Sequence, residues 1–433
     1  MESQNGEYSM LENVSFVINT ACNELDNLKL LLKSLQKNLD RDTHQILVFI
    51  DSDNQGTYEW LKSVKNDFND LKIITHSLPP CIGYSRNNNL LVELADNEIV
   101  SYLQSDMVIS PGYDTDILRD IENNCILSAT RVEPPLHGES PQTITKDFGL
   151  EPDGFDFDEW NNYAPTVKQD KESTFFFAPI TFYKSLWLSL GGYDTYFRRS
   201  REDSDFVQRC VHKGVKLKQT HNAIVYHFTC TSSRGKDWHN PKNTEAQERV
   251  QLQKQADIIE VKRFIRKWGN LNHGESKLVK YDVDFTISNS INFHPNFIAQ
   301  IEPLASRVWI DSDLSEINEI VLNEHKLANK LLGFTEDQWN TAKQFYNLDD
   351  YSNVYKDLTK EKLLQYNILV EINALKFTQD DANVLNSLHS IIENTEVGDY
   401  EYGNLIFRIR SKNAINSTEM SNPVFDNKLL NIV

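Results

Sequence analysis

The chain has 433 residues, of which 39% are hydrophobic and 11% aromatic, with only 16 glycines and 13 prolines. This composition excludes a disordered or fibrous protein, and the length predicts two or three domains. The formal net charge of −19 disfavours nucleic acid and anionic membrane surfaces as partners.

Five widely spaced cysteines form no CxxC pair, so the sequence predicts neither a disulfide framework nor a structural zinc site. The N-terminal stretch MESQNGEYSMLE lacks the basic and apolar regions of a secretion signal. No run of about 18 apolar residues occurs, so an integral membrane segment is not expected. Together these features favour a cytoplasmic protein.

Strand and helix patterns alternate in the N-terminal part of the chain. Short apolar runs predict strands at 14–19, 46–50, 71–75 and 99–103, and helical patterns lie between them at 25–39, 57–68 and 85–95. This order predicts a mostly parallel sheet with helices on both faces. Beyond Pro111 the pattern is irregular: we expect strands at 125–130, 173–178 and 223–226, helices at 184–190 and 203–213, and a long loop at 132–163.

The pattern changes again near residue 270. A long charged helix at about 244–268 could bridge two domains, and the segments at 281–287, 317–331 and 368–410 predict further strands and helices. We therefore expect a larger domain over 1–269 and a smaller α/β or α+β domain over 270–433. The sequence assigns no chemistry to the second domain, and acceptor binding, homo-oligomerisation and partner binding stay open as its role. The tail after Lys412 is expected to be loosely held.

The carboxylate of Asp106 closely follows the fourth predicted strand. In an open α/β sheet, ligands bind where such strands end. One carboxylate, together with diphosphate oxygens and water, suits Mg²⁺ or Mn²⁺. His227 also ends a predicted strand and is the candidate second ligand, although a lone histidine equally fits a structural role.

Charged residues in other predicted turns and helix starts could bind the same ligand. Asp51 follows ILVFI and can accept hydrogen bonds from a base or ribose, but the stretch Asp51 to Asn54 also fits ordinary turn chemistry. Arg86 opens a helix and could reach a phosphate, or simply lie on the surface. Arg234 and Lys236 could clamp phosphates if their Gly-containing loop folds over the site.

The segment RRSREDSDFVQR holds three acids in four positions, Glu202, Asp203 and Asp205. Capping and the helix dipole favour acids near a helix N-terminus, which is the structural explanation for them. Capping alone does not require three acids. Glu202 and Asp203 are therefore candidates for a catalytic base, with Asp205 as the runner-up.

Together these segments resemble a family 2 glycosyltransferase of the GT-A fold, over about residues 14–234. VSFVINTACNE resembles the first strand and turn of that family, and FIDSDNQGT its second strand with the nucleotide-binding aspartate. GYSRNNNLLVELADNEIVSYLQSDM resembles the Gly–Arg–Asn helix and the metal-binding DxD strand. FFFAPITFYKSLWLSLGGYDTYF resembles the acceptor-side segment with its Gly–Gly–aromatic–Asp turn, and REDSDFVQR resembles the ED motif.

The resemblance implies a Rossmann-like GT-A domain that transfers a sugar, with inversion, from a nucleoside-diphosphate sugar to a hydroxyl of a glycan or another acceptor. It implies Mn²⁺ or Mg²⁺ as cofactor and a place in polysaccharide biosynthesis. The resemblance implies that Asp203 and Glu202 act in catalysis and that Asp106 and His227 bind the metal. The implied donor-binding residues are Asn19, Asp51, Arg86, Gln104, Arg234 and Lys236. The implied acceptor side is formed by Gly192, Tyr193 and Asp194, with Trp160 or Tyr163 stacked on a sugar ring.

Two departures from the family pattern keep alternatives open. Gln104 stands where the first acid of the DxD motif is expected, and the turn after the first strand is one residue longer than usual. Gln104 supports a catalytically decayed nucleotide-sugar-binding or scaffold protein, whereas Arg86 and the pair Glu202–Asp203 favour an enzyme. A sugar-phosphate nucleotidyltransferase shares the sheet but usually opens with a Gly-rich loop, and VINTACNE contains no glycine.

Overall fold

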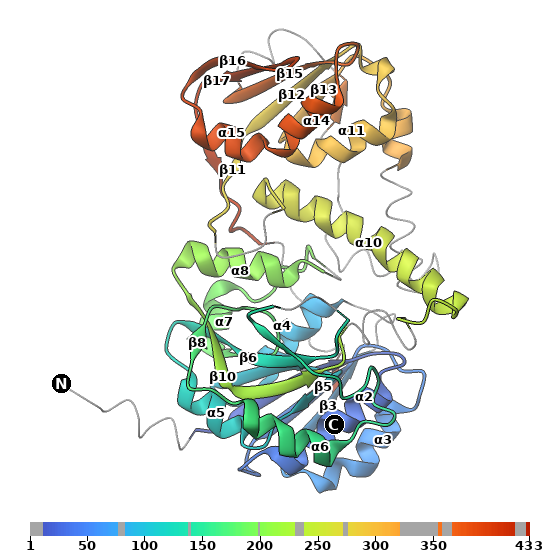
Figure 1. Cartoon of the computed structure of the whole chain (residues 1–433), viewed down its shortest axis with the longest axis vertical. Coiled ribbons are helices and arrows are strands. Elements are labelled where there is room, and N and C mark those ends of the chain that lie inside the picture. The colour runs from blue at the N-terminus through green and yellow to red at the C-terminus, as the bar shows by residue number, and fades with distance from the viewer. Residues whose placement is uncertain are drawn as a thin grey trace, which may run out of the picture. The chain divides into compact units, whose positions relative to one another are not determined.

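The computed structural model describes residues 12–76, 83–136, 140–197, 200–229, 238–271, 276–320, 354–356, 366–420 and 430–433, and the chain forms two compact units (Figure 1). The first unit holds the described residues up to 251 together with 430–433, and the second holds those between 252 and 420. This division falls inside helix α10 (Thr244–Trp268), whereas the sequence predicts a boundary after that helix, near 270.

The first unit is built on one large, mostly parallel sheet, as predicted. Its central order is β19-β3-β2-β1-β4-β9-β6-β10-β5. The strands that run in one direction are β1 (Val14–Thr20), β2 (Gln45–Ile50), β3 (Leu71–His76), β4 (Ile99–Gln104), β6 (Cys125–Glu133) and β10 (Lys216–His227). The strands β5 (Met107–Ile109), β9 (Ile180–Tyr183) and β19 (Leu430–Ile432) run antiparallel to their neighbours, and β7 (Thr143–Thr145) and β8 (Glu172–Ser173) pair with β6 and β10 at the side.

Both faces of this sheet are buried. Successive residues of β1, such as Phe16 and Val17, point to opposite faces, and both are fully buried. Helix α2 (Leu25–Asn38) contributes its leucines to the core cluster around Phe16, and α4 (Tyr84–Leu94) packs against β1 and β2. Further helices of this unit are α3 (Thr57–Val64), α5 (Tyr113–Asp120), α7 (Lys184–Leu190) and α8 (Glu202–Lys213).

The predicted loop over 132–163 is more ordered than its composition suggests. It contains β7 and helix α6 (Phe157–Tyr163). Asp156 caps the N-terminus of α6, because its side chain accepts a hydrogen bond from the backbone N–H of Glu159 over 2.8 Å. Buried aromatic rings from this segment, such as Phe148, pack around Tyr226 of β10. The acid-rich segment therefore carries a core of its own.

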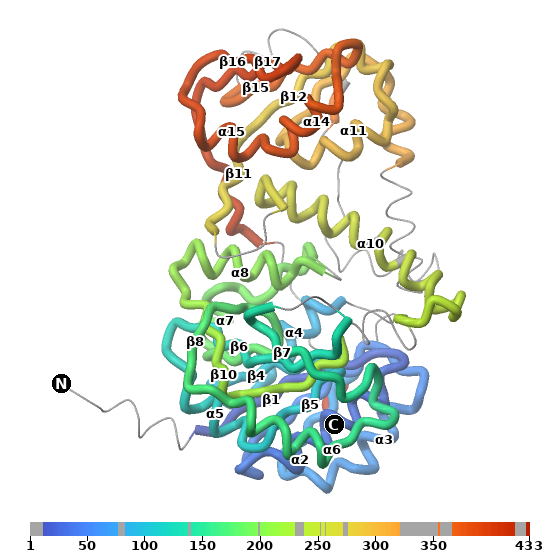
Figure 2. The backbone as a smooth tube through the Cα atoms, in the orientation of Figure 1, coloured from blue at the N-terminus to red at the C-terminus, as the bar shows by residue number. Residues whose placement is uncertain are grey.

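The last residues of the chain also differ from the prediction. β19 pairs antiparallel with β3, and Ile73 and Val433 exchange two backbone hydrogen bonds of 2.9 Å. The C-terminus thus belongs to the unit formed by N-terminal residues, as the trace in Figure 2 shows. The expectation of a loosely held tail is wrong for residues 430–433.

The second unit is a smaller α/β structure, as predicted. Its six-stranded sheet has the order β14-β13-β12-β15-β17-β16, of which the first four strands are parallel. These strands are β12 (Val283–Ser288), β13 (Arg307–Ile310), β14 (Val354–Lys356), β15 (Ile368–Asn373), β16 (Gly398–Tyr402) and β17 (Leu405–Ile409). Helices α11 (Pro295–Ile301), α14 (Gln379–Asn386) and α15 (Leu388–Asn394) contribute to its core, and β11 (Lys280–Tyr281) pairs with β18 (Ala414–Ile415). No described helix in either unit combines the length and apolar character that crossing a bilayer requires.

Candidate active site

Three predicted donor-binding residues meet at the carboxyl edge of the first unit's sheet. Strands β2, β1 and β4 are neighbours, and Asn19 of β1 lies opposite Gln104 of β4. Asp51 follows β2 directly, and its backbone N–H donates to the Thr20 carbonyl over 2.9 Å. Because adjacent parallel strands end at the same edge, Asn19, Asp51 and Gln104 lie where ligands bind in such sheets.

The two loops beside these residues are joined to each other by hydrogen bonds. The backbone N–H of Cys22 donates to Ser52 Oγ over 3.2 Å. Asn23 and Asn54 form two hydrogen bonds, of 2.9 and 3.0 Å, in which each residue donates once. These contacts hold the loops after β1 and β2 in one arrangement, which reduces the ordering cost of ligand binding there.

The turn role that the sequence allows for Asp51 belongs instead to Asp53. The Asp53 carboxylate accepts three backbone N–H groups at the start of α3, each over 3.0 Å, from Gln55, Thr57 and Tyr58. Asp51 contacts His76, whose Nε2 lies 2.9 Å from the Asp51 carbonyl oxygen and 3.4 Å from its Oδ1. The contacts at the start of α3 thus come from Asp53, and the Asp51 carboxylate lies beside His76.

Asp106 and His227 come together across two antiparallel strands. β5 and β10 pair so that His227 lies opposite Met107, and the Phe228 N–H donates to the Asp106 carbonyl over 3.1 Å. His227 Nε2 lies 3.7 Å from Asp106 Oδ1, and both residues are buried. Within the described ranges, no three His, Cys, Asp or Glu side chains form a group that could hold a metal ion. A metal at Asp106 and His227 would need further oxygens from a bound ligand or water.

Two carboxylates that the sequence analysis did not single out lie beside this pair. Glu133 Oε1 lies 2.8 Å from His227 Nδ1. Glu24 Oε2 accepts Ser105 Oγ over 2.8 Å, next to Asp106. Burial raises the pKa of Glu24 to about 8, and the charge of Asp106 adds to the increase. Glu133 is the last residue of β6, so a longer version of the strand predicted at 125–130 would have placed it at the carboxyl edge of the sheet. No pattern in the sequence marks Glu24 as a site residue.

The predicted base and the predicted metal ligand lie near the same phenol. Gln104 Nε2 donates to Tyr84 Oη over 3.2 Å. Burial raises the pKa of Tyr84 well above its usual range. The negative charge of Glu202 is the next cause, and the charges of Asp106 and Asp203 add to it. The charges of the ED pair and of the aspartate that follows β4 thus all raise the pKa of Tyr84.

The runner-up base, Asp205, is committed to the fold. Its carboxylate is fully buried and pairs with Arg209, one helical turn further along α8, over 2.9 Å. Arg209 also donates to the carbonyl oxygens of Leu190 and Gly192, over 2.6 Å each. Asp205 thus supports the turn that follows α7, while Asp203 is only partly buried at the start of α8.

The Gly191–Gly192 turn is held against α4 by one side chain. Asn89 Oδ1 accepts the Tyr193 N–H, and Asn89 Nδ2 donates to the Tyr193 carbonyl, both over 2.8 Å. Gly192 has φ +70°, and a Cβ atom there would lie 2.3 Å from Asn89 Oδ1. The second glycine is therefore required both by its backbone conformation and by the close approach of Asn89.

We expect Gly192→Ala to lower the free energy of unfolding by about 3 kcal/mol or more, because left-handed strain and overpacking add. The matched control is Gly214→Ala, at φ +68° with no heavy atom within 4 Å of the new Cβ. That variant should lose only about 1–2 kcal/mol. Denaturant titrations of both variants measure the difference, and equal losses would contradict the role given to the Asn89 contact.

The predicted acceptor-side aromatic residues are placed differently. Trp160 is 0% exposed, and its Nε1 donates to the Ile109 carbonyl over 3.1 Å. Its ring packs against Phe148 and Tyr226 in the core, so the structure does not support sugar stacking by Trp160. Tyr163 is partly buried at the edge of the same cluster, and its stacking stays a prediction.

The Gly–Gly–aromatic–Asp turn is mostly interior. Tyr193 is buried against Trp187 and Phe206, with ring centroids 4.8 and 5.5 Å away. Asp194 is also buried, and its Oδ1 accepts the Tyr196 N–H over 3.0 Å. Any influence of Gly192, Tyr193 and Asp194 on an acceptor therefore comes from the shape of the turn and not from an exposed ring.

The predicted phosphate-binding cations divide into two groups. Arg86 lies in the first turn of α4 and is only 4% exposed, so it is not a surface arginine. Arg234 and Lys236 lie outside the described residues, and their proposed contact with phosphates stays a prediction.

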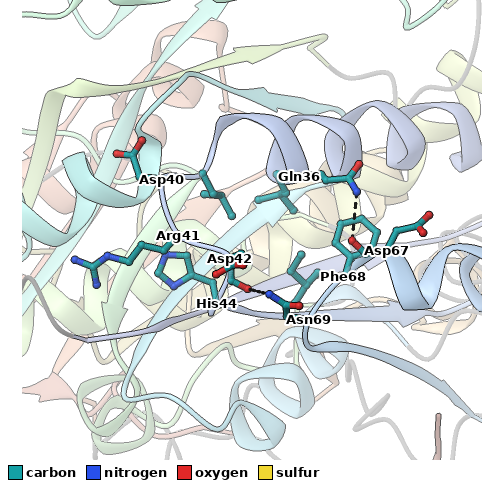
Figure 3. Close-up of a pocket in the computed structure, with 11 residues that line it drawn as sticks. Gln36, Asp40, Arg41, Asp42, His44, Asp67, Phe68 and Asn69 are labelled. Atoms are coloured by element: carbon teal, nitrogen blue, oxygen red, sulfur yellow. Dashed lines mark hydrogen bonds between the residues drawn. The ribbon is translucent and has the colours of Figure 1, made fainter.

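A separate cavity of about 600 Å³ opens at the other edge of the sheet (Figure 3). It is lined by residues that precede β2 and β3 or end α2, among them Gln36, Asp40, Arg41, Asp42, His44, Asp67, Phe68 and Asn69. Gln36 donates to the Asp67 carbonyl across it, over 3.3 Å. The cavity contains none of the predicted site residues, and ligands of parallel sheets bind at the opposite, carboxyl edge.

The first unit thus presents acids and amides at the carboxyl edge of a mostly parallel sheet, where open α/β folds bind their ligands. Residues 16–174 match the family model described as glycosyl transferase family 2, and this match lies within the first unit. The first unit therefore contains a segment that is similar to family 2 glycosyltransferases, and this segment lies on the large, mostly parallel sheet. No curated protein matches the chain.

Similar solved structures are remote in sequence. Staphylococcus aureus TarS, residues 1–349 in complex with UDP, is 14% identical with a TM-score of 0.37, and the match covers 80% of this chain and 94% of that one. S. aureus TarS in a longer form is 13% identical with a TM-score of 0.38, covering 74% and 55%. GalNAc-T7 with UDP, GalNAc and Mn²⁺ is 12% identical with a TM-score of 0.38, covering 50% and 43%. The chain thus spans about half the length of the last two structures.

Proposed function

We propose that the chain is a metal-dependent, inverting glycosyltransferase that moves a sugar from a nucleoside-diphosphate sugar to a hydroxyl of a glycan or another acceptor. The observation that carries this proposal is the pair formed by Asp106 and His227 at the carboxyl edge of the sheet, with His227 Nε2 3.7 Å from Asp106 Oδ1. A donor diphosphate near Asp106 would leave its anomeric carbon within the reach of a base on α8.

The residues at Asp106 fit a divalent cation. A carboxylate oxygen and an imidazole nitrogen 3.7 Å apart form a mixed O/N donor set, which suits Mn²⁺ better than Mg²⁺. Because no three His, Cys, Asp or Glu side chains of the described residues could hold an ion together, the oxygens of the donor would have to complete such a site. When bound, such an ion would stabilise the charge that develops on the leaving diphosphate.

In the proposed reaction Asp203 accepts the proton of the acceptor hydroxyl. The acceptor oxygen forms a bond to the anomeric carbon as the bond from that carbon to the diphosphate oxygen breaks, so the sugar is transferred with inversion. Glu202 at the same helix start, Arg86, and the edge residues Asn19, Asp51 and Gln104 would orient the donor. A cytoplasmic location, a role in polysaccharide biosynthesis and homo-oligomerisation through the second unit stay predictions from the sequence.

A panel of UDP-, GDP- and dTDP-sugars tests the proposal. With Mn²⁺ and no acceptor, we expect slow release of nucleoside diphosphate from at least one sugar, measured by chromatography. A chelator should stop this release, and added Mn²⁺ should restore it. Binding of a nucleotide-sugar without release, with or without acceptor extracts, would favour the decayed binding protein that Gln104 suggests.

A further inference from the structure

We infer that Glu133 is a positioning residue that orients His227, so that its Nε2 faces Asp106 and is ready to bind a metal ion. This inference rests on the proposed function. Glu133 and His227 are the last residues of β6 and β10, which are parallel neighbours in register at Val132 and Tyr226. Their side chains meet at the sheet's carboxyl edge, where Glu133 Oε1 lies 2.8 Å from His227 Nδ1.

The contact favours one of the two tautomers of the neutral His227 ring. An ionised carboxylate can only accept a hydrogen bond, so Nδ1 must be the donor. A neutral imidazole with Nδ1 protonated has its lone pair on Nε2. A histidine that binds a metal through one nitrogen usually donates the other N–H to such a carboxylate, which raises its basicity as a ligand.

The distance on the other side of the ring supports this assignment. His227 Nε2 lies 3.7 Å from Asp106 Oδ1, which is too long for a hydrogen bond. In the neutral tautomer with the proton on Nδ1, both atoms are acceptors, and a cation between them would offset their repulsion. The ring is thus bonded on the Glu133 side and faces a second acceptor on the Asp106 side.

A second buried histidine shows what a purely structural pair looks like. His44 Nε2 lies 3.0 Å from Asp114 Oδ2, and His44 Nδ1 accepts the Val14 N–H over 3.0 Å. Both nitrogens of His44 are therefore used within the fold. In His227, by contrast, only Nδ1 has a hydrogen bond to a described residue, and Nε2 faces Asp106 at 3.7 Å. This difference distinguishes His227 from His44.

Glu133 is itself held in place by Arg131. The Arg131 Nη1 lies 3.5 Å from Glu133 Oε1, and its Nε donates to the Ala178 carbonyl over 2.6 Å. The guanidinium also lies over the rings of Phe175 and Phe177, 5.4 and 5.8 Å from their centroids. These contacts fix the end of β6 against the segment that precedes β9, which keeps Glu133 directed at His227.

The test uses the full chain with Mn²⁺ and UDP, and electron paramagnetic resonance of free Mn²⁺ to measure affinity. We expect Glu133→Gln and Glu133→Ala to weaken Mn²⁺ binding about 10- to 100-fold. The nitrogen NMR signals of His227, assigned by their loss in His227→Ala and recorded at a pH where the ring is neutral, should show the Nδ1-protonated tautomer in the metal-free protein and a mixture in Glu133→Gln. The matched control is Asp114→Asn, which alters the structural pair and should leave Mn²⁺ affinity unchanged.

Two outcomes would overturn the inference, and they are distinguishable. If both Glu133 variants bind Mn²⁺ as tightly as the unmodified chain while Asp106→Asn and His227→Ala do not, the metal site stands and Glu133 does not position it. If Asp106→Asn and His227→Ala also bind Mn²⁺ normally, the proposed metal site itself is wrong. A changed histidine signal with unchanged affinity would likewise count against a positioning role.

Discussion

Replacing Asp106 with Asn is expected to lower the rate of sugar transfer by about a thousandfold or more. The variant keeps the size of the side chain but loses the negative charge that would hold a divalent cation at the end of β4. Metal stabilisation of a leaving diphosphate contributes several kcal/mol, and each 1.4 kcal/mol is about tenfold in rate. The measurement is the initial rate of transfer at saturating donor, together with the affinity for Mn²⁺.

The control for this variant is Asp96→Asn. Asp96 makes an ion pair with Lys72 over 2.5 Å, and its side chain is 63% exposed. Exposed ion pairs contribute little to stability, so this variant should fold and react within about twofold of the unmodified chain. A fully active Asp106→Asn enzyme would remove the metal from the proposed reaction.

The second large effect is expected for Asp203→Asn. An amide cannot take the proton of an acceptor hydroxyl, so the transfer rate should fall by about a thousandfold. Affinity for the nucleotide-sugar, measured by calorimetry, should stay within about twofold because the donor site is unchanged. A loss confined to the rate at saturating donor and acceptor is typical of a group that acts only in the transition state.

Asp205→Asn separates chemistry from folding at the same helix. Its carboxylate is buried and pairs with Arg209, so the variant leaves an arginine without its charged partner and should unfold more readily. The fraction of Asp205→Asn molecules that stays folded should still transfer sugar. If instead Asp203→Asn retained activity and a stably folded Asp205→Asn lost it, the assignment of the base would pass to Asp205.

Much of the first unit could be predicted from local patterns. Strands buried on both faces are continuous apolar runs, so β1, β2, β3 and β4 were visible in the sequence, and the polar residues that follow them lie at one edge, as such a sheet requires. The resemblance to a GT-A enzyme depended on the same segments, and the family match covers them.

The features that were missed depend on contacts between distant segments. Glu133 gains its meaning from His227, 94 positions away, and Glu24 from Ser105, 81 positions away. Trp160 lies in an acid-rich segment without clear periodicity, and only its packing on Phe148 and Tyr226 shows that it is a core residue. The ion pair between Asp205 and Arg209 is different, because it could have been predicted: an acid four residues before an arginine on a helix is a pattern that can be read from the sequence.

The pairing of β19 with β3 has a consequence for how the chain can be divided. Because the chain returns to the first unit after residue 421, the second unit is an insertion within the first and not an appendage after it. A catalytic fragment that stopped after α10 would leave the backbone N–H and C=O groups of β3 bare along an open sheet edge, which invites association between molecules. A fragment of the first unit that keeps residues 430–433 paired with β3 would keep that edge covered.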